Sequence, residues 1–212
     1  MVNFRHELTI VKLGGSHALE PHLRDWLAML ARCRGRAILV PGGGLFADQV
    51  RRMQAAMGFD DGAAHQMALL AMEQFGTAIC SLEPALVPAA SLPQIRKTLR
   101  EGRTPVWMAT KMALDAADCV PSSWNVTSDS LAAWLARCIG SRRVMLVKHG
   151  APFGDRPNIS DLAARQIVDP LFAQYLDAAS AEAVFVGPAD HARASELLGA
   201  PIEPRFAGVL GE

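Results

Sequence analysis

A short segment near the start of the chain places a positive charge beside two glycines. Lys12 ends an apolar run and is followed by Gly14, Gly15 and Ser16. In an open α/β sheet, ligands bind beyond the carboxyl ends of the strands, where glycines let backbone N–H groups approach phosphate oxygens. We therefore predict a phosphate-binding segment here. The competing interpretation is a tight turn beside a solvated lysine.

A second glycine-rich segment follows the next apolar run. Gly42, Gly43 and Gly44 come directly after Pro41 and precede a predicted helix. Backbone amides at a helix N-terminus bind anions, and three consecutive glycines cost backbone entropy that an ordinary turn does not require. The segment is predicted to hold an anion, with a flexible connection as the alternative. It is not a GxxxxGK[ST] phosphate loop, because the lysine precedes the glycines.

A third group of polar residues stands past the middle of the chain. Thr127, Ser128 and Asp129 precede a helical pattern. One interpretation is a plain helix N-cap with hydroxyls and an acid in the first turn. Asp129 has a second interpretation, because a carboxylate in a crevice can hold a lysine in place or help to bind a phosphate-bound Mg²⁺.

Lysine is scarce, so the position of each lysine is informative. The sequence has four lysines against seventeen arginines. Lys148 lies at the end of the predicted strand 143–147, before His149 and Gly150, and can contact a nucleotide phosphate. His149 has two interpretations, a general acid or base and a loop histidine with neither role, and the second is favoured for a lone loop histidine. His65, beside an apolar helix face, is interpreted as structural.

The elements that position these residues alternate along the chain. Apolar runs predict strands, and stretches with a period near 3.6 residues predict helices. Strands are predicted at 8–11, 37–40, 85–89, 105–108, 143–147 and 183–186, and helices at about 20–34, 44–57, 63–76, 92–100, 127–139, 169–179 and 190–198. A loop of broken structure is predicted at 109–126. This alternation is typical of α/β proteins, and it predicts a three-layer αβα sandwich with a mostly parallel central sheet.

Length and composition narrow the class of protein. The 212 residues predict a single domain over 1–212, and a formal net charge of zero argues against nucleic-acid or anionic-membrane partners. The four cysteines form no CxxC pair, so we expect no bound zinc. With no apolar leader at the N-terminus, we expect a cytoplasmic protein. The apolar helix at 63–76 predicts a homo-oligomer.

The motifs, in this order, resemble the amino acid kinase family. The resemblance covers nearly the whole chain. It rests on Val11–Ser16, Pro41–Gly44, Ala64–Gln74, Trp124–Ala136 and Val168–Pro170. It implies an αβα sandwich, ATP and Mg²⁺ as cofactors, and a small-molecule partner.

The resemblance also implies roles for the site residues. Lys12 is expected to stabilise charge on the transferred phosphoryl group, and Asp129 to orient Lys12 and the metal-bound phosphates. The other expected contacts divide into a nucleotide set and an acceptor set. The nucleotide set is Gly14, Gly15, Ser16, Lys148 and Gly150, and the acceptor set is Gly42, Gly43, Gly44, Thr127 and Ser128. No metal-ligating set is expected in the chain itself.

Within the family, the segments 64–74 and 124–136 resemble a short subgroup that phosphorylates a phosphorylated furanmethanol in methanofuran-type cofactor biosynthesis. The implied activity is an ATP-dependent kinase for such an acceptor. Two alternatives stay open. One is a kinase for a nucleoside monophosphate, an amino acid or a carbamate. The other is a non-catalytic nucleotide- or anion-binding regulatory protein, because Val147–Gly150 lacks the aspartate that many members carry before the glycine.

Overall fold

A parallel six-stranded sheet organises the molecule. The computed structural model describes residues 8–151, 153 and 157–199. The strand order is β3-β4-β2-β1-β5-β6. The strands are β1 Thr9–Leu13, β2 Ala37–Pro41, β3 Leu86–Ala89, β4 Thr104–Trp107, β5 Arg143–Val147 and β6 Glu182–Val186. The predicted α/β class and parallel sheet are confirmed.

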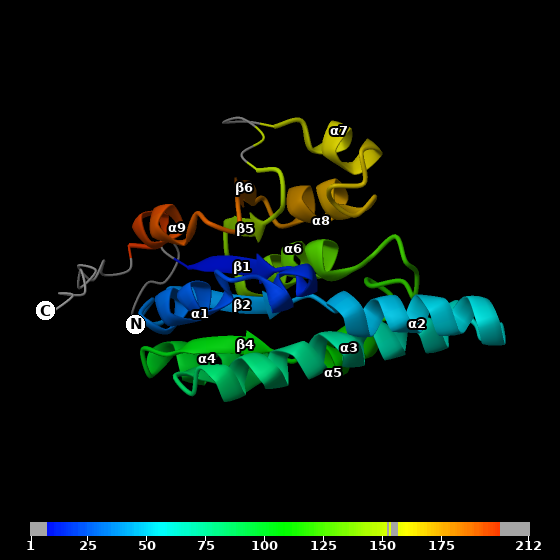
Figure 1. The fold of residues 1–212 in the computed structure, drawn as a ribbon, viewed down its shortest axis with the longest axis horizontal. Coiled ribbons are helices and arrows are strands. Elements are labelled where there is room, and N and C mark those ends of the chain that lie inside the picture. Colours follow the sequence, from blue (N-terminus) through cyan, green and yellow to red (C-terminus); the bar gives the residue numbers. More distant parts are fainter. Residues whose placement is uncertain (1–7, 152, 154–156, 200–212) are drawn as a thin grey trace, which may run out of the picture.

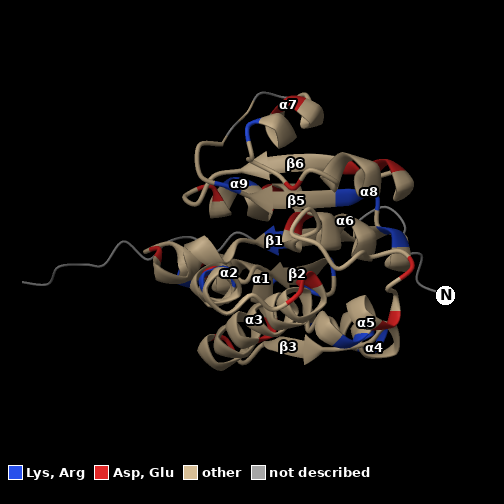
Figure 2. Ribbon diagram, turned by 90° about the vertical axis from the view of Figure 1, so that its right-hand side faces the viewer, with Lys and Arg blue, Asp and Glu red and all other residues tan. Residues whose placement is uncertain are grey.

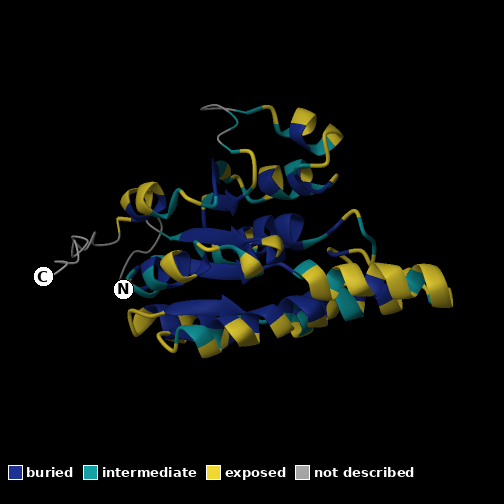
Figure 3. Ribbon diagram, in the orientation of Figure 1, coloured by how far each residue is buried: buried dark blue, intermediate teal, exposed yellow. Residues whose placement is uncertain are grey.

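Helices cover both faces of the sheet and complete the predicted three layers (Figure 1). The helices are η2 Gly15–Leu19 (a 3-10 helix), α1 Leu23–Ala31, α2 Gly44–Met57, α3 Asp61–Leu82, α4 Leu92–Arg100, α5 Thr110–Asp115, α6 Ser128–Ile139, α7 Ile159–Ala164, α8 Phe172–Ala178 and α9 His191–Leu197. One core joins α4, α5, α6 and α8 to one face of the sheet, and a second core joins α1, α9 and the latter half of α3 to the other face. The four inner strands between them are buried almost throughout, whereas the edge strands β3 and β6 are partly exposed (Figure 3).

The alternation of side chains along β1 decides where Lys12 lies. Ile10 belongs to the core on the α6 side of the sheet, whereas Val11 and Leu13 belong to the core on the α1 side. Successive residues of a strand point to opposite faces, so Lys12 shares the α6 side with Ile10. Figure 2 shows a blue segment within β1, the strand that carries this lysine, between largely uncharged strands.

The structure corrects several predicted boundaries. The helix predicted at 20–34 is shorter, because the chain first forms η2 and α1 runs only from Leu23 to Ala31. The predicted loop at 109–126 contains α5, and α7 was not predicted. The helix predicted at 169–179 begins only at Phe172, since Asp169 and Pro170 occupy a turn that precedes it.

The apolar helix that predicted an oligomer is largely used within the chain. Residues of α3 such as Leu69, Met72 and Phe75 are buried in the two cores. Exposed apolar side chains lie instead on α2, which runs beside α3 past the carboxyl end of the sheet (Figure 1), and they include Leu45 and Met57. The homo-oligomer stays a prediction, and its best candidate surface is now α2. In the described part of the chain, no helix is long and apolar enough to cross a membrane.

Candidate functional site

Two lysines share one buried carboxylate at the carboxyl ends of β1 and β5. The Lys12 Nζ atom lies 2.9 Å from Asp129 Oδ1, and the Lys148 Nζ atom lies 2.6 Å from Asp129 Oδ2. β1 and β5 pair so that Leu13 faces Val147, which brings Lys148 beside the end of β1. Asp129 reaches both lysines from the first turn of α6. We call these three residues the lysine–aspartate triad.

The triad carries an excess of positive charge in a buried place. Asp129 is 3% exposed and Lys12 is 6% exposed. Burial alone would raise the pKa of Asp129, but the ammonium groups of Lys12 and Lys148 hold it below its ordinary value. Burial and the neighbouring Lys12 lower the pKa of Lys148, against the attraction of Asp129. Two cations against one anion leave a charge that a bound phosphate can neutralise.

The two glycine-rich segments pack backbone against backbone beside the triad. A Cβ on Gly15 would lie 2.2 Å from the Gly44 nitrogen, and a Cβ on Gly42 would lie 2.6 Å from the Gly15 nitrogen. Gly44 also has a φ of +50°, in the left-handed region. Close packing therefore explains these three glycines, and it argues against the alternative of a flexible connection at Gly42–Gly44.

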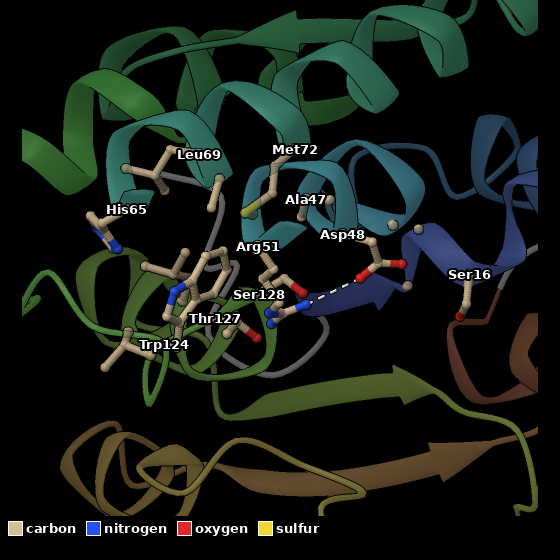
Figure 4. A pocket seen from close by; sticks show the side chains of 18 of the residues that line it. Ser16, Ala47, Asp48, Arg51, His65, Leu69, Met72, Trp124, Thr127 and Ser128 are labelled. Atoms are coloured by element: carbon tan, nitrogen blue, oxygen red, sulfur yellow. Dashed lines mark hydrogen bonds and ion pairs between the residues drawn. The ribbon is translucent and has the colours of Figure 1, made fainter. Parts of the chain in front are cut away.

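A pocket of about 160 Å³ opens beside these segments. Figure 4 shows it running from Ser16 at one end to His65 and Trp124 at the other, with Arg51 between them. Its lining brings together most of the predicted site residues: Lys12, Gly14, Gly15, Ser16, Gly42, Gly43, Gly44, Thr127 and Ser128. The sequence analysis assigned no binding role to several other lining residues, among them Ala47, Asp48, Arg51, Asp61, Leu69 and Met72.

The structure separates two predicted nucleotide contacts from this pocket. Lys148 does not line it, because its ammonium group turns toward Asp129. Gly150 is exposed, has a φ of +79° and does not line it either. A Cβ there would meet only Phe153, at 3.8 Å or more. Gly150 therefore occupies a left-handed turn, and that turn is a sufficient reason for the glycine.

Asp169 holds the start of α6, a role that the sequence analysis missed. Its Oδ2 accepts hydrogen bonds from the backbone N–H groups of Thr127 and Ser130, at 2.9 Å each, and its Oδ1 accepts one from Thr127 Oγ1 at 2.5 Å. Burial and the nearby Asp129 raise the pKa of Asp169, and the hydrogen bonds oppose that rise. Asp169 fixes the turn that presents Asp129. Its signal in the sequence is an acid just before Pro170, far from the helix that it caps.

Two histidines cover the other side of the Gly14–Ser16 segment. The His17 and His149 rings stack with centroids 4.5 Å apart, and His17 Nε2 donates to the Val147 carbonyl oxygen at 3.1 Å. Burial lowers the pKa of His17 to about 4, with smaller contributions from His149 and Lys12, against the effect of the Val147 hydrogen bond. His17 is therefore neutral at physiological pH. It links the glycine segment to the end of β5.

The triad suits nucleotide phosphates better than a directly bound metal. Both oxygens of Asp129 face an ammonium group, so this carboxylate is already neutralised. Mg²⁺ usually reaches such sites with the phosphates of its substrate and keeps several waters. The residues fit a nucleotide that brings its own Mg²⁺, with Lys12 and Lys148 as the cations beside the phosphates.

A separate His-Asp-His group lies outside the pocket. His22, Asp25 and His191 have potential ligand atoms within 4.8 Å of one another, although the sequence predicted no metal-ligating set. None of the three lines the pocket. His22 Nδ1 is 3.6 Å from Asp25 Oδ2, and both side chains are well exposed.

Comparisons with known proteins agree with this geometry. The model of the amino acid kinase family matches residues 7–151. The chain is 24% identical over 139 residues to a [5-(aminomethyl)furan-3-yl]methyl phosphate kinase from Methanocaldococcus jannaschii. That match covers 65% of this chain and 63% of the relative, so it spans less than two thirds of the relative's length.

Solved structures with the same fold include kinases of nucleoside monophosphates. A uridylate kinase from Archaeoglobus fulgidus superposes with a TM-score of 0.66 at 15% identity, covering 89% of this chain and 95% of that one. A UMP kinase from Bacillus anthracis gives 0.64 at 13% identity, covering 91% of each chain. At these identities the likeness establishes the fold alone.

Proposed function

Since the chain belongs to the amino acid kinase family by the match of residues 7–151, we propose that it is an ATP-dependent phosphotransferase acting on a small phosphorylated alcohol. The observation that carries the proposal is the buried lysine–aspartate triad beside two interlocked glycine segments. The furanmethyl phosphate kinase similar to this chain supports the finer assignment. We therefore propose a furanmethyl phosphate as the acceptor, in methanofuran-type cofactor biosynthesis.

In the proposed reaction, an oxygen of the acceptor phosphate attacks the γ-phosphorus of ATP. The bond from that phosphorus to the β–γ bridging oxygen breaks, ADP leaves, and the acceptor becomes a diphosphate. A phosphate monoester has its second pKa near about 6 and is largely unprotonated at neutral pH. The nucleophile therefore needs no general base. This agrees with the neutral state of His17 and with the interpretation of His149 as a loop histidine that is neither general acid nor general base.

Positioning and charge neutralisation are the work left to the protein. Lys12 stabilises charge on the transferred phosphoryl group, and Lys148 does the same from the β5 side. Asp129 holds both ammonium groups in place. The Gly14–Ser16 segment donates backbone N–H groups to phosphate oxygens of ATP. Gly43 and Gly44 do the same for the acceptor, since the Gly42 N–H already donates to the Leu13 carbonyl oxygen at 2.8 Å. Mg²⁺ bound to ATP supplies further neutralisation of the phosphates.

The test is steady-state kinetics with a matched pair of lysine variants. Purified protein receives ATP, Mg²⁺ and a furanmethyl phosphate, and ADP release is followed. Lys12→Met is expected to lower kcat by about 10²–10³-fold, the usual cost of removing one transition-state stabiliser. Lys111→Met removes an exposed lysine and is expected to leave kcat unchanged. Equal kcat values in the two variants would contradict the role of Lys12.

The same assay separates the alternatives. A panel of uridine monophosphate, amino acids and carbamate tests other acceptors, because the correct acceptor stimulates ADP release and raises the thermal stability of the native protein. Absence of ADP release with every acceptor, together with ATP binding in calorimetry, would favour a non-catalytic binding protein on this fold.

A further inference from the structure

Two helices from opposite ends of the chain meet on one face of the sheet. α1 and α9 pack against each other, and their buried residues belong to the same core. His22 immediately precedes α1, Asp25 lies in its first turn, and His191 is the first residue of α9. The contact between the helices therefore brings together two imidazoles and a carboxylate, outside the pocket beside the lysine–aspartate triad.

The spacing of the ligand atoms in this His-Asp-His group suits a small metal ion. One nitrogen of each imidazole and one oxygen of Asp25 lie within 4.8 Å of one another, and His22 Nδ1 lies 3.6 Å from Asp25 Oδ2. Zn²⁺ bonds to nitrogen and oxygen at about 2.0–2.2 Å, so two ligand atoms of a tetrahedral zinc ion lie about 3.4 Å apart. The His22–Asp25 pair is already close to this spacing, and no other pair has to approach by more than about 1.4 Å.

The imidazole rings of the group are not stacked on each other. The centroids of the His22 and His191 rings are 6.0 Å apart, and their planes are tilted by 33°. A second pair of histidines differs, because the rings of His17 and His149 are stacked with centroids 4.5 Å apart. An imidazole nitrogen binds a metal in the plane of its ring, so stacked rings cannot hold an ion between them. The wider, tilted arrangement of His22 and His191 can do so.

The polar atoms of the group are not committed to other partners. In the described part of the chain, Asp25 has an ion-pair contact with His22 alone, since the neighbouring Arg24 donates to the Leu82 carbonyl oxygen at 3.2 Å. The His22 side chain forms no capping hydrogen bond with α1. The Nδ1 atom of His191 is shielded from solvent and has no hydrogen-bond partner among the described residues. Such nitrogens are rare in native proteins, and a metal ion is a partner that neutral imidazole readily takes.

Hydrogen bonds hold the two sides of the group in fixed positions. Trp26, one helical turn after His22, donates from Nε1 to the Pro188 carbonyl oxygen at 2.7 Å, and this bond ties α1 to the turn that precedes α9. Within that turn, Asp190 Oδ2 accepts a hydrogen bond from the Gly187 N–H group at 2.7 Å. The backbones that carry the three side chains are therefore positioned before any ion binds, and less affinity is lost to ordering.

The types of ligand select the class of metal. Imidazole suits zinc, copper, iron and nickel, whereas Mg²⁺ takes oxygen ligands and keeps several waters. Two histidines and one carboxylate, as in catalytic zinc sites, leave the fourth tetrahedral position to water. The group therefore favours a different ion from the Mg²⁺ that is proposed to arrive with ATP.

We propose that His22, Asp25 and His191 bind a divalent transition-metal ion, with Zn²⁺ as the ion that fits best, and that this ion clamps α9 to α1. Each histidine contributes one ring nitrogen, Asp25 contributes one carboxylate oxygen, and water completes the tetrahedron. The unfolded chain does not bring these distant residues together, so the ion binds the native protein and stabilises it. The site is independent of phosphoryl transfer and goes beyond the proposed function.

The test is a calorimetric titration of the metal-free protein, without a histidine tag, with Zn²⁺ in a buffer that contains excess Mg²⁺. His22→Ala and His191→Ala are each expected to weaken the Kd of the tightest Zn²⁺ site by at least about 100-fold, because loss of an outer-shell partner alone costs about 10–100-fold in metal affinity. His149→Ala is the matched control. It removes a histidine that is exposed like His22 but lies outside the group, and it is expected to keep the wild-type Kd.

Thermal unfolding provides the second readout. At free Zn²⁺ of about 100 times Kd, binding to the native state is expected to raise Tm by about 5–11 °C in the wild type and in His149→Ala. The rise is expected to disappear in His22→Ala and in Asp25→Asn. The absence of Zn²⁺ binding by the wild type, or an equal Kd and an equal rise in Tm in His22→Ala, overturns the proposal. If His191→Ala fails to fold, the other two variants still decide, because the side chains of His22 and Asp25 are exposed.

Discussion

Replacement of Asp129 by asparagine tests whether one carboxylate neutralises two buried lysines. The change keeps the shape of the side chain and removes its charge. The new amide has a single oxygen, which cannot serve both ammonium groups, and these lie 2.9 and 2.6 Å from the present carboxylate. Breaking a buried ion pair by removing one partner costs about 3–5 kcal/mol. For a chain of this size, about 3 kcal/mol lowers Tm by about 6–12 °C.

The matched control is Asp115→Asn. Asp115 pairs with Lys111 at 2.7 Å, a distance within the range of the triad, but the two side chains are 65% and 70% exposed. An exposed pair contributes about 0–1 kcal/mol, so this variant is expected to unfold within about 3 °C of the wild type. The comparison holds the chemistry constant and changes only burial.

Phosphate binding provides the second readout of the same variant. The wild-type triad has an excess of one positive charge, and Asp129→Asn raises the excess to two. ATP without Mg²⁺ is therefore expected to raise Tm more in Asp129→Asn than in the wild type, since a ligand that binds only the native state stabilises it. Adenosine, which lacks phosphates, serves as the control ligand.

Acidification gives a third readout, with a defined sign. The pKa of Asp129 in the folded protein lies below the ordinary value of 3.8, so its contribution is complete above that value and is lost as the pH falls through the folded pKa. The stability difference between wild type and Asp129→Asn is expected to be constant from about pH 5 to 8 and to narrow below about pH 4. Equal Tm values near neutral pH and equal ATP-induced shifts in the two proteins would refute the assignment of Asp129.

Three further predictions concern the residues that support the triad. Gly15→Ala is expected to prevent native folding or to lower Tm strongly in thermal unfolding, because the new Cβ meets the Gly44 backbone at 2.2 Å. Gly102→Ala has open space around it and meets only the strain of its φ of +69°, so it is expected to cost about 1–2 kcal/mol. Asp169→Ala leaves two backbone N–H groups at the start of α6 unpaired and is expected to lower the free energy of unfolding by about 2 kcal/mol or more. Asp169→Asn keeps an acceptor oxygen and is expected to lower it less. The Tm values of the two variants test this order. The pKa of His17 is lowered to about 4 in the folded protein, so on acidification the unfolded chain takes up this proton first and the stability falls as the pH drops from about 6.5 to about 4. His17→Gln is expected to make that fall smaller in unfolding curves measured across this pH range. An unchanged pH profile in this variant would contradict the role of His17.

The parallel sheet could be predicted because its strands are short apolar runs separated by helical patterns. β1, β2 and β5 are buried over almost their whole lengths, so the sequence shows continuous apolar residues there. The helix boundaries were harder. η2 occupies the start of a stretch with helical spacing, and only the conformation of Glu20, extended at ψ 143°, ends it before α1 begins.

The candidate site could be predicted where its residues stand at the ends of strands. Lys12 and the glycine segments satisfied that rule. Lys148 also satisfied it, and its pairing with Asp129 is a contact that the sequence analysis did not predict. The register between β1 and β5 decides that contact, and one sequence does not reveal a strand register.

The end of the pocket at His65 and Trp124 could not be predicted from the sequence. His65 was interpreted as structural because it stands beside apolar residues on a helix. That its Nε2 atom has no hydrogen-bond partner among the described residues is known only from the structure. The same holds for the position of Trp124, which is distant in sequence and lies opposite α3 (Figure 4). Gln54 joins that tryptophan to Asp61 through two hydrogen bonds, and no spacing pattern predicts such a chain.

Direct observation of the product is the measurement closest to the central claim. Phosphorus NMR of a mixture of protein, ATP, Mg²⁺ and [5-(aminomethyl)furan-3-yl]methyl phosphate reports the fate of the γ-phosphoryl group. The account predicts the coupled signals of an organic diphosphate, appearing with ADP and absent with the Lys12→Met protein. Inorganic phosphate as the only new signal, or an unchanged spectrum with folded wild-type protein, would contradict it.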